Sequence, residues 1–357
     1  MTDLAELTTL RVGGPALRLL APGSEADLIA LVRECDAARE PVLVLGGGSN
    51  LLVADSGFEG TVIRTDGLRG IVPEDVMACS GAFLNVAAGE PWDDFVASCV
   101  TQGFVGVEAL SGIPGLVGST PIQNVGAYGQ EVSQTIARVR VWDRQLHQVR
   151  TLFSSDCGFG YRDSVFKRNP GRHVVLSVSF QLALGRMSTP LTYRELARRL
   201  GVTEGELAPL VEVREAVLEL RRGKGMVLDP ADHDTWSAGS FFTNPILTPE
   251  QAGALPAEAP RFPAIQQAIG RGGARPVADD RVKTSAAWLI ERAGFGRGYG
   301  TPPATLSTKH ALALTNRGGA TAADLVALAR EIRDGVERAF GIRLVPEPVL
   351  VGLSLDG

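Results

Sequence analysis

Residues 113–129 read IPGLVGSTPIQNVGAYG, and this run decides how we interpret the rest of the chain. With the two residues before it, the segment 111–129 holds five glycines, separated by small hydroxyl and apolar side chains. Glycine lets a backbone approach a ligand closely, so such a segment can surround a flat cofactor with polar edges. A purely structural loop of this length is uncommon in a compact domain. We therefore favour a cofactor-binding segment.

A second glycine-rich loop precedes this run. The apolar residues 42–45 predict a buried strand, which leads into the loop at 46–50, and an apolar pattern resumes at 51–53. Successive backbone amides in such a loop can bind a diphosphate. The spacing is neither GxGxxG nor GxxxxGKS/T, so a Rossmann fingerprint and a P-loop are both excluded. A tight turn between two strands explains the glycines equally well, and both interpretations stay open.

Apolar periodicity and capping residues predict the other elements. A strand with one polar face is expected at 176–182, where apolar residues alternate with Ser177, Ser179 and Gln181. The proline-rich stretch 247–263 predicts a surface loop. Together these patterns predict an α+β protein. Helices are expected over residues 24–39, 91–102, 203–222, 285–292 and 321–340.

The composition is that of a soluble globular protein of two or three domains, with 357 residues, 45% of them hydrophobic and 21% charged. The net charge of -5 and the absence of a basic run argue against nucleic acid as a partner. The N-terminus lacks the features of a secretory signal, and no apolar run reaches the roughly 20 residues of a membrane-spanning helix. The four cysteines form no CxxC and the four histidines are scattered, so we expect reduced thiols and no metal site.

Three further segments carry groups suited to chemistry. They are FGYRDSVFK at 159–167, AGSFFTNP at 238–245 and VPE at 345–347. They provide a guanidinium, a hydroxyl and a carboxylate from distant parts of the chain. A site that moves protons and stabilises a developing anion needs such a set.

The order of these motifs closely resembles the bacterial UDP-N-acetylenolpyruvoylglucosamine reductases, also called UDP-N-acetylmuramate dehydrogenases, over essentially the full length. The motifs include LGGGSN at 45–50, the run 113–129 and KHALALTN at 309–316. The resemblance implies a two-part FAD-binding domain of the vanillyl-alcohol-oxidase / para-cresol-methylhydroxylase type. It further implies a C-terminal α/β substrate-binding domain that closes over the substrate. FAD bound noncovalently, NADPH as electron donor and a cytoplasmic step of peptidoglycan precursor synthesis also follow from it.

The resemblance also implies the domain boundaries. We expect the first FAD-binding subdomain at 1–67, the second at 68–225 and the substrate-binding domain at 226–344, with the tail 345–357 returning to the first subdomain. The stretch 190–196 looks like the tyrosine loop of one family subtype, so we assign the loop-bearing subtype. An ordinary helix-start residue is the alternative for Tyr193.

The family reduces an enol ether: hydride from reduced flavin adds to the vinyl carbon, and negative charge develops at the neighbouring carbon. Arg162 matches the active-site arginine, whose planar fork suits a carboxylate gaining charge. Ser240 matches the proton donor. Glu347 matches a C-terminal glutamate that acts as a neutral acid or orients a water. The alternatives are an ion pair of Arg162 with Asp163 or another acid, a helix-cap or turn serine, and an exposed glutamate near the end of the chain.

The remaining family positions bind cofactor and substrate. Pro348 departs from the family pattern and restricts the backbone at Glu347. His310 is a less uniform substrate neighbour, for which a structural histidine fits equally well. Substrate contacts are expected from Tyr193, Lys224, Asn244 and His310. FAD contacts are expected from Gly46, Gly47, Gly48, Ser49, Asn50, Gly118, Ser119, Thr120, Pro121, Ile122, Asn124, Gly126 and Ala127.

These assignments predict a monomer that acts by a ping-pong mechanism on a small-molecule substrate, the enolpyruvyl UDP-sugar. One alternative is another flavoenzyme of the same fold, such as a carbohydrate or alcohol oxidase, which needs the glycine loops but not Arg162, Ser240 and Glu347 together. A second alternative is a flavin- or nucleotide-binding module without catalytic activity.

Overall fold

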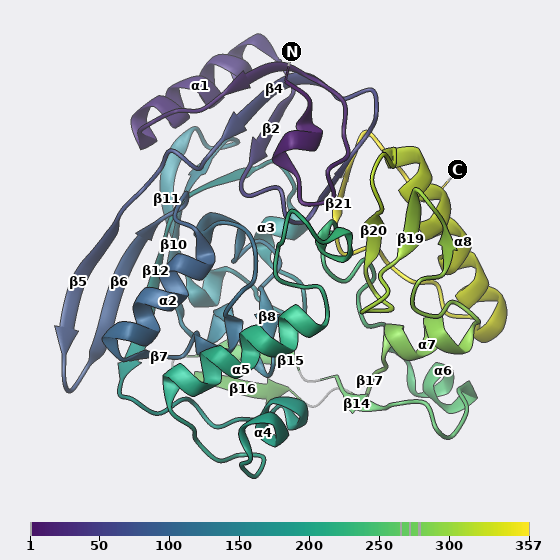
Figure 1. The fold of residues 1–357 in the computed structure, drawn as a ribbon. Helices are drawn as coiled ribbons and strands as arrows, with labels where there is room; N and C mark the ends of the chain where they lie inside the picture. The colour runs from purple at the N-terminus through teal and green to yellow at the C-terminus, as the bar shows by residue number, and fades with distance from the viewer. Residues whose placement is uncertain (1, 265, 271–272, 278–279, 357) are drawn as a thin grey trace.

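The computed structural model describes residues 2–264, 266–270, 273–277 and 280–356. Figure 1 shows helices and mostly short strands along the whole chain, with the C-terminal strand β21 beside the N-terminal part of the molecule. The predicted α+β class is confirmed. No helix in these described ranges combines the length and apolar character that crossing a membrane requires.

The N-terminal part is built on a small parallel sheet with the strand order β1-β4-β2. The strands are β1 (Ala16–Leu20), β2 (Val42–Leu45) and β4 (Phe58–Arg64). The predicted helix is α1 (Glu25–Ala38), where Ser24 accepts the N–H of Asp27 at 3.1 Å. After the glycine loop, β3 (Leu51–Val53) pairs in parallel with β21 (Val349–Val351) from the C-terminus.

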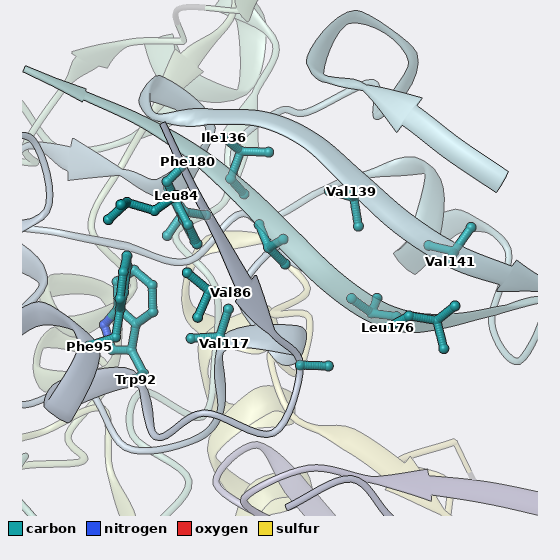
Figure 2. Close-up of a cluster of buried hydrophobic side chains, with 14 of the residues drawn as sticks. Leu84, Val86, Trp92, Phe95, Val117, Ile136, Val139, Val141, Leu176 and Phe180 are labelled. Atoms are coloured by element: carbon teal, nitrogen blue, oxygen red, sulfur yellow. The ribbon is translucent and has the colours of Figure 1, made fainter. Parts of the chain in front are cut away.

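A larger antiparallel sheet forms the centre, with the order β11-β10-β12-β6-β5 and β7 paired to the end of β12. Helix α2 (Trp92–Gln102) packs on it: the rings of Trp92 and Phe95 lie 6.0 and 4.9 Å from that of Phe180. Figure 2 shows these side chains within one buried cluster. The strands are β5 (Ile71–Met77), β6 (Gly81–Ala87), β7 (Phe104–Val105), β10 (Ile136–Asp143), β11 (Gln148–Phe153) and β12 (His173–Leu184).

The prediction of an exposed polar face on β12 is wrong in part. Ser177 and Ser179 are buried, although Gln181 is exposed. Long polar side chains of the flanking strands lie beside Ser179: the Nε of Arg138 donates to its hydroxyl at 3.1 Å, and the hydroxyl donates to Asn85 at 3.3 Å. The hydroxyl of Ser179 thus makes its hydrogen bonds within the protein, without contact with solvent.

The C-terminal part carries the longest predicted helix, α8 (Ala322–Phe340), and α7 (Ala286–Arg292). Both are confirmed: Ser285 caps α7, Thr321 and Asp324 form a capping box at α8, and Gly341 ends α8 at φ +66°. The strands of this part are β13 (Ile246–Leu247), β14 (Phe262–Pro263), β15 (Gln266–Gly270), β16 (Gly273–Val277), β17 (Val282–Lys283), β18 (Gly300–Thr301), β19 (Ala304–Leu306) and β20 (Leu314–Asn316).

Two sequence predictions fail in the connecting regions. The stretch 247–263 contains α6 (Pro249–Ala254), opened by a capping box between Thr248 and Gln251. The helix expected from residue 203 begins only at Leu210, as α5 (Leu210–Gly223), and a separate α4 (Arg194–Leu200) precedes it. The reason is that residues 205–208 hydrogen bond to the backbone of 188–191 instead, for example Gly205 N–H to the Leu191 carbonyl at 2.8 Å.

Several bonds join the N-terminal and C-terminal parts directly. The Asp55 carboxylate accepts the N–H groups of Ala322 and Ala323 at 2.7 and 3.0 Å, at the start of α8. The amide of Asn316 donates to the carbonyls of Leu10 and Arg11 at 3.1 and 3.2 Å. With the β3–β21 pairing, these bonds place residues 345–351 beside the first glycine loop.

Candidate active site

A cavity of about 290 Å³ lies where the two glycine-rich loops meet the C-terminal strand. Arg162, Ser240 and Glu347, which are far apart in sequence, all line it. Of the residues predicted to bind FAD, Gly118, Pro121 and Asn124 are not among the lining residues. Those that do line it are Gly46, Gly47, Gly48, Ser49, Asn50, Ser119, Thr120, Ile122, Gly126 and Ala127.

The glycine triplet serves the packing of the chain as well as the cavity. A Cβ on Gly47 would lie 2.7 Å from the Cα of Gly115, and one on Gly48, which has φ +61°, would lie 1.8 Å from the Leu7 carbonyl oxygen. A Cβ on Gly46 would meet only side-chain atoms within 4 Å, the nearest being the Ser119 hydroxyl at 3.2 Å. The tight-turn interpretation fits Gly48, which has positive φ. Gly47 instead allows the close approach of Gly115 from the second glycine loop, and Gly46 lines the cavity beside Ser119.

Gly118 also has a packing role. Its Cβ would lie 2.6 Å from the Cβ of Ala88, at the end of β6, in the short 3-10 helix Val117–Ser119. The N–H of Gly118 donates to the Ala88 carbonyl at 2.9 Å. Gly118 thus brings the second glycine loop against the central sheet, which positions Ser119 and Thr120 at the cavity.

The cavity lining fits a flat cofactor with an apolar body and polar edges. Its walls include Ile113, Leu116 and Val125, and glycine backbone forms one rim. The Nε of Arg221, a lining residue, is buried without a hydrogen-bond partner in the described ranges, whereas the Nε of Arg162 lies 2.9 Å from Oε1 of Glu347. Buried donors of this kind require an acceptor. A flavin nucleotide offers carbonyl and phosphate oxygens to such donors.

Arg162 is held in an uncommon backbone conformation at φ +52°. Its guanidinium donates to the Gly126 carbonyl at 2.8 Å, and its Nε lies 2.9 Å from Oε1 of Glu347. The ion pair that the alternative expected is formed with Glu347 and not with Asp163, which pairs with Arg168. A non-glycine residue at positive φ is tolerated where the surroundings hold it, and such sites are often functional.

Glu347 is anchored by its backbone on both sides of Pro348. Its N–H donates to the Phe241 carbonyl at 2.8 Å, and the N–H of Val349 donates to the Asn50 carbonyl at 3.0 Å. The side chain is 12% exposed, so the exposed-glutamate alternative is wrong. Pro348 therefore does not prevent Glu347 from lining the cavity.

Ser240 is placed by the two buried rings that follow it. Phe241 and Phe242 are each 1% exposed and pack edge to face at 5.2 Å. The Phe241 N–H donates to the Leu312 carbonyl at 2.7 Å, and Gly239 turns the chain at φ +73°. Ser240 thus lines the cavity on a short segment that the buried phenylalanines and the bond to Leu312 hold in place.

The residues predicted to bind substrate do not line this cavity. Tyr193 occupies the N-cap position of α4, as the helix-start alternative expects, yet its ring is 42% exposed and meets Tyr128 edge-on at 5.3 Å. The Nζ of Lys224 lies 5.5 Å from the Tyr128 ring and pairs with Glu195 at 2.5 Å. Tyr193 and Lys224 thus meet at Tyr128.

His310 and Asn244 each have a structural bond. The Nδ1 of His310 accepts the N–H of Leu312 at 3.0 Å, and burial, together with the charge of Lys224, lowers the pKa of His310 to about 4. The side-chain oxygen of Asn244 accepts the N–H of Ala286 at 2.9 Å, at the start of α7. His310 is therefore a neutral imidazole whose Nε2 carries the proton.

Two parts of the chain match known families, and relatives match nearly its whole length. Residues 16–151 match a family described as FAD binding domain, and residues 229–351 match UDP-N-acetylenolpyruvoylglucosamine reductase, C-terminal domain. The UDP-N-acetylenolpyruvoylglucosamine reductase of Cutibacterium acnes is 56% identical, over 99% of this chain and 90% of the relative. That of Thermobifida fusca is also 56% identical, over 99% of this chain and 97% of the relative.

The chain belongs to the UDP-N-acetylenolpyruvoylglucosamine reductase family. The expected FAD-dependent oxidoreductase is thereby confirmed. The crystal structure of UDP-N-acetylenolpyruvylglucosamine reductase from Thermus caldophilus has the same fold, with a TM-score of 0.60 at 23% identity, over 98% of this chain and 97% of that one.

Several polar residues near the site of this reductase family member were missed by sequence reasoning. Gln123 lines the cavity and lies inside the quoted run, so its place there was the available signal. Lys283 has its Nζ 4.7 Å from the Tyr161 ring, and burial lowers the pKa of this lysine. Burial raises the pKa of Glu131, which accepts from Asn124 at 2.9 Å. A lone lysine in a two-residue strand gives no sequence signal.

Proposed function

We propose that this chain catalyses the NADPH-dependent, FAD-mediated reduction of UDP-N-acetylenolpyruvoylglucosamine to UDP-N-acetylmuramate, a cytoplasmic step of peptidoglycan precursor synthesis. The observation that carries the proposal is that Arg162, Ser240 and Glu347 line one cavity with both glycine loops. An oxidase of the same fold has no need for these three groups together. The names of the relatives supply the substrate class.

The two glycine loops would hold the cofactor at the cavity. The loop 46–50 and the residues 118–127 named above are the proposed contacts, and Arg221 adds a buried guanidinium beside them. FAD, when bound and reduced by NADPH, supplies the hydride for the vinyl carbon of the sugar. The chain's own residues must then orient the sugar, exclude water and handle charge and a proton.

Arg162 would stabilise the charge that develops next to the substrate carboxylate, and Glu347 would assist either as a neutral acid or by orienting a water. A guanidinium is permanently charged and presents donors in a plane, which suits a carboxylate that becomes enolate-like. The ion pair with Glu347 and the bond to the Gly126 carbonyl orient this fork before substrate arrives. Such preorganised donors cost no rearrangement during the reaction.

Ser240 would deliver the proton to the carbon that bears the charge. A serine hydroxyl is a weak acid, so it works only where a strongly basic carbanion forms beside it. The buried Phe241 and Phe242 keep its segment in place. Proton delivery and the Glu347 carboxyl thus come from neighbouring segments of the cavity wall, since the Glu347 N–H donates to the Phe241 carbonyl at 2.8 Å.

The nucleotide part of the substrate would be held by Tyr193, Lys224, Asn244 and His310. Lys224 pairs with Glu195 in this structure. A bound diphosphate would contact the Lys224 ammonium in place of Glu195 or together with it. His310 is a neutral N–H donor, because the pKa of its imidazole is about 4. A neutral donor binds a sugar or phosphate oxygen without carrying a charge.

The proposed organisation is a monomer of three domains: subdomain 1 at 1–67 with the tail 345–357, subdomain 2 at 68–225 and the substrate domain at 226–344. The β3–β21 pairing supports the return of the tail to subdomain 1. The proposed partners are NADPH and the enolpyruvyl UDP-sugar, without nucleic acid.

Initial-rate kinetics test the ping-pong form of the proposal. Both ligands carry a diphosphate, so a shared site predicts parallel lines when the NADPH concentration is varied at several sugar concentrations. Intersecting lines would contradict the shared site. Oxygen-dependent turnover of a simple alcohol or sugar, without reduction of the enolpyruvyl UDP-sugar, would favour the oxidase alternative.

A further inference from the structure

The side-chain amide of Gln123 links the first glycine loop to Glu347. Its Oε1 accepts from the Nδ2 of Asn50 at 3.0 Å, and its Nε2 donates to Oε1 of Glu347 at 3.3 Å. The same Nδ2 of Asn50 donates to the main-chain carbonyl of Glu347 at 3.3 Å. Asn50 and Gln123 therefore form a short chain of amides that begins and ends at Glu347.

The main-chain carbonyl of Glu347, which can only accept a hydrogen bond, decides which atom of each side-chain amide is the nitrogen and which is the oxygen. The main-chain carbonyl of Glu347 has no proton to give, so the atom of Asn50 that faces it must be the nitrogen. That nitrogen also faces Gln123, so the Gln123 atom opposite it must be the oxygen. The nitrogen of Gln123 is then left to face the Glu347 carboxyl. Neither amide can be flipped without placing two like groups together.

Two groups thus act on the same oxygen of Glu347. Oε1 receives the N–H of Gln123 and lies 2.9 Å from the positively charged Arg162 Nε, whose N–H is not aligned for a hydrogen bond. The donor and the positive charge therefore both lie at Oε1 and hold this oxygen in place. Oε2 has no hydrogen-bond partner in the ranges that the structure describes.

We propose that Gln123, oriented by Asn50, is a positioning residue that holds Glu347 so that Oε1 faces Gln123 and Arg162 and Oε2 faces the reaction. The inference rests on the proposed function, since it specifies how Glu347 serves the reduction of the sugar. It makes Oε2 the oxygen that meets the substrate or a water. It also ties the Glu347 carboxyl to the loop that would hold the cofactor.

Two substitutions of similar size separate positioning from space filling. Gln123→Met removes both the donor to Glu347 and the acceptor of the Asn50 amide, whereas Gln123→Glu keeps that acceptor and replaces the donor with an acceptor that faces Oε1. We expect sugar reduction, followed in single turnover of the NADPH-reduced holoenzyme, to slow by about 10- to 100-fold in the methionine variant, and by more in the glutamate variant. FAD content and the rate of NADPH oxidation are measured in parallel, so that any change in cofactor binding is separated from the effect on sugar reduction. A role in space filling predicts that the isosteric glutamate variant is the milder one.

A double-mutant cycle with Glu347→Gln and crystal structures of the variants complete the test. In the Glu347→Gln background, Gln123→Met should slow sugar reduction no further, since its effect acts through Glu347. In the crystal structure of Gln123→Met, the Glu347 carboxyl should be displaced from the position that it has beside Arg162 in the wild type. If Glu347→Gln slows sugar reduction but Gln123→Met leaves both the rate and the carboxyl unchanged, the positioning role is wrong while the proposed function stands. If Glu347→Gln has no effect, the role of Glu347 itself fails.

Discussion

Replacing Gly47 by alanine tests the contact on which both glycine loops depend. The added Cβ would lie 2.7 Å from the Cα and 3.3 Å from the carbonyl carbon of Gly115, both backbone atoms. Carbon atoms in contact prefer about 3.5–4.0 Å, so one loop must move by roughly 1 Å. Overpacking of this kind costs about 1–3 kcal/mol. If the cavity needs both loops in place, most of that cost weakens FAD binding, by about 5- to 150-fold.

The assay is a fluorescence titration of FAD into the flavin-depleted protein, with the thermal unfolding midpoint measured in parallel. Gly23→Ala is the matched control, because a Cβ there meets nothing within 4 Å and the residue does not have positive φ. Gly46→Ala is a second comparison, in which the nearest atom is the Ser119 hydroxyl at 3.2 Å. If Gly47→Ala binds FAD as tightly as Gly23→Ala and unfolds at the same temperature, the loops do not form the site as described.

Three other outcomes follow from particular contacts. Ser240→Ala should retain FAD and be reduced by NADPH at the normal rate, but reduce the sugar about 100- to 10,000-fold more slowly; a loss below tenfold in single turnover would exclude Ser240 as the proton donor. The pKa of His310 is lowered from 6.5 to about 4, so between these pH values the imidazole is protonated only in the unfolded chain. As the pH falls from about 7 to about 4, the free energy of unfolding of the wild type should therefore decrease by up to about 3 kcal/mol more than that of His310→Asn. Equal pH dependence of the two proteins in urea titrations would contradict this. Asp55→Ala should lower the free energy of unfolding by about 0.5–2 kcal/mol, because it removes the acceptor for the first N–H groups of α8. Asp55→Asn should recover part of this loss in the same titrations. An unchanged free energy of unfolding in Asp55→Ala would show that Thr321 alone caps the helix.

Elements set by neighbouring residues could be predicted from the sequence. Helices α1, α7 and α8 begin where Ser24, Ser285 and Thr321 cap them, and a cap acts within three residues of itself. The predictions failed where distant segments decide. The start of α5 depends on backbone bonds between residues 205–208 and 188–191, and the buried face of β12 depends on Arg138 and Asn85 from other strands. For α6 the local signal was present in Thr248 and Gln251, but the proline-rich composition favoured a loop.

The candidate site shows the same division. The sequence indicated the segments that carry Arg162, Ser240 and Glu347, since each lies in a distinctive motif. It could not indicate that Arg162 pairs with Glu347 rather than Asp163, nor that Gln123 reaches Glu347 across 224 residues. It also could not separate Gly46, which leaves room at the cavity, from Gly47 and Gly48, whose missing side chains let other backbone segments approach.

The most direct test of the central claim is an anaerobic absorbance titration of the purified protein with NADPH, followed by the enolpyruvyl UDP-sugar. The account predicts a yellow flavin spectrum that bleaches with NADPH and returns when the sugar is added. Bleaching without return would keep a flavoenzyme but contradict the proposed substrate. A protein that shows no flavin spectrum, even after incubation with FAD, would contradict the cofactor site on which the account depends.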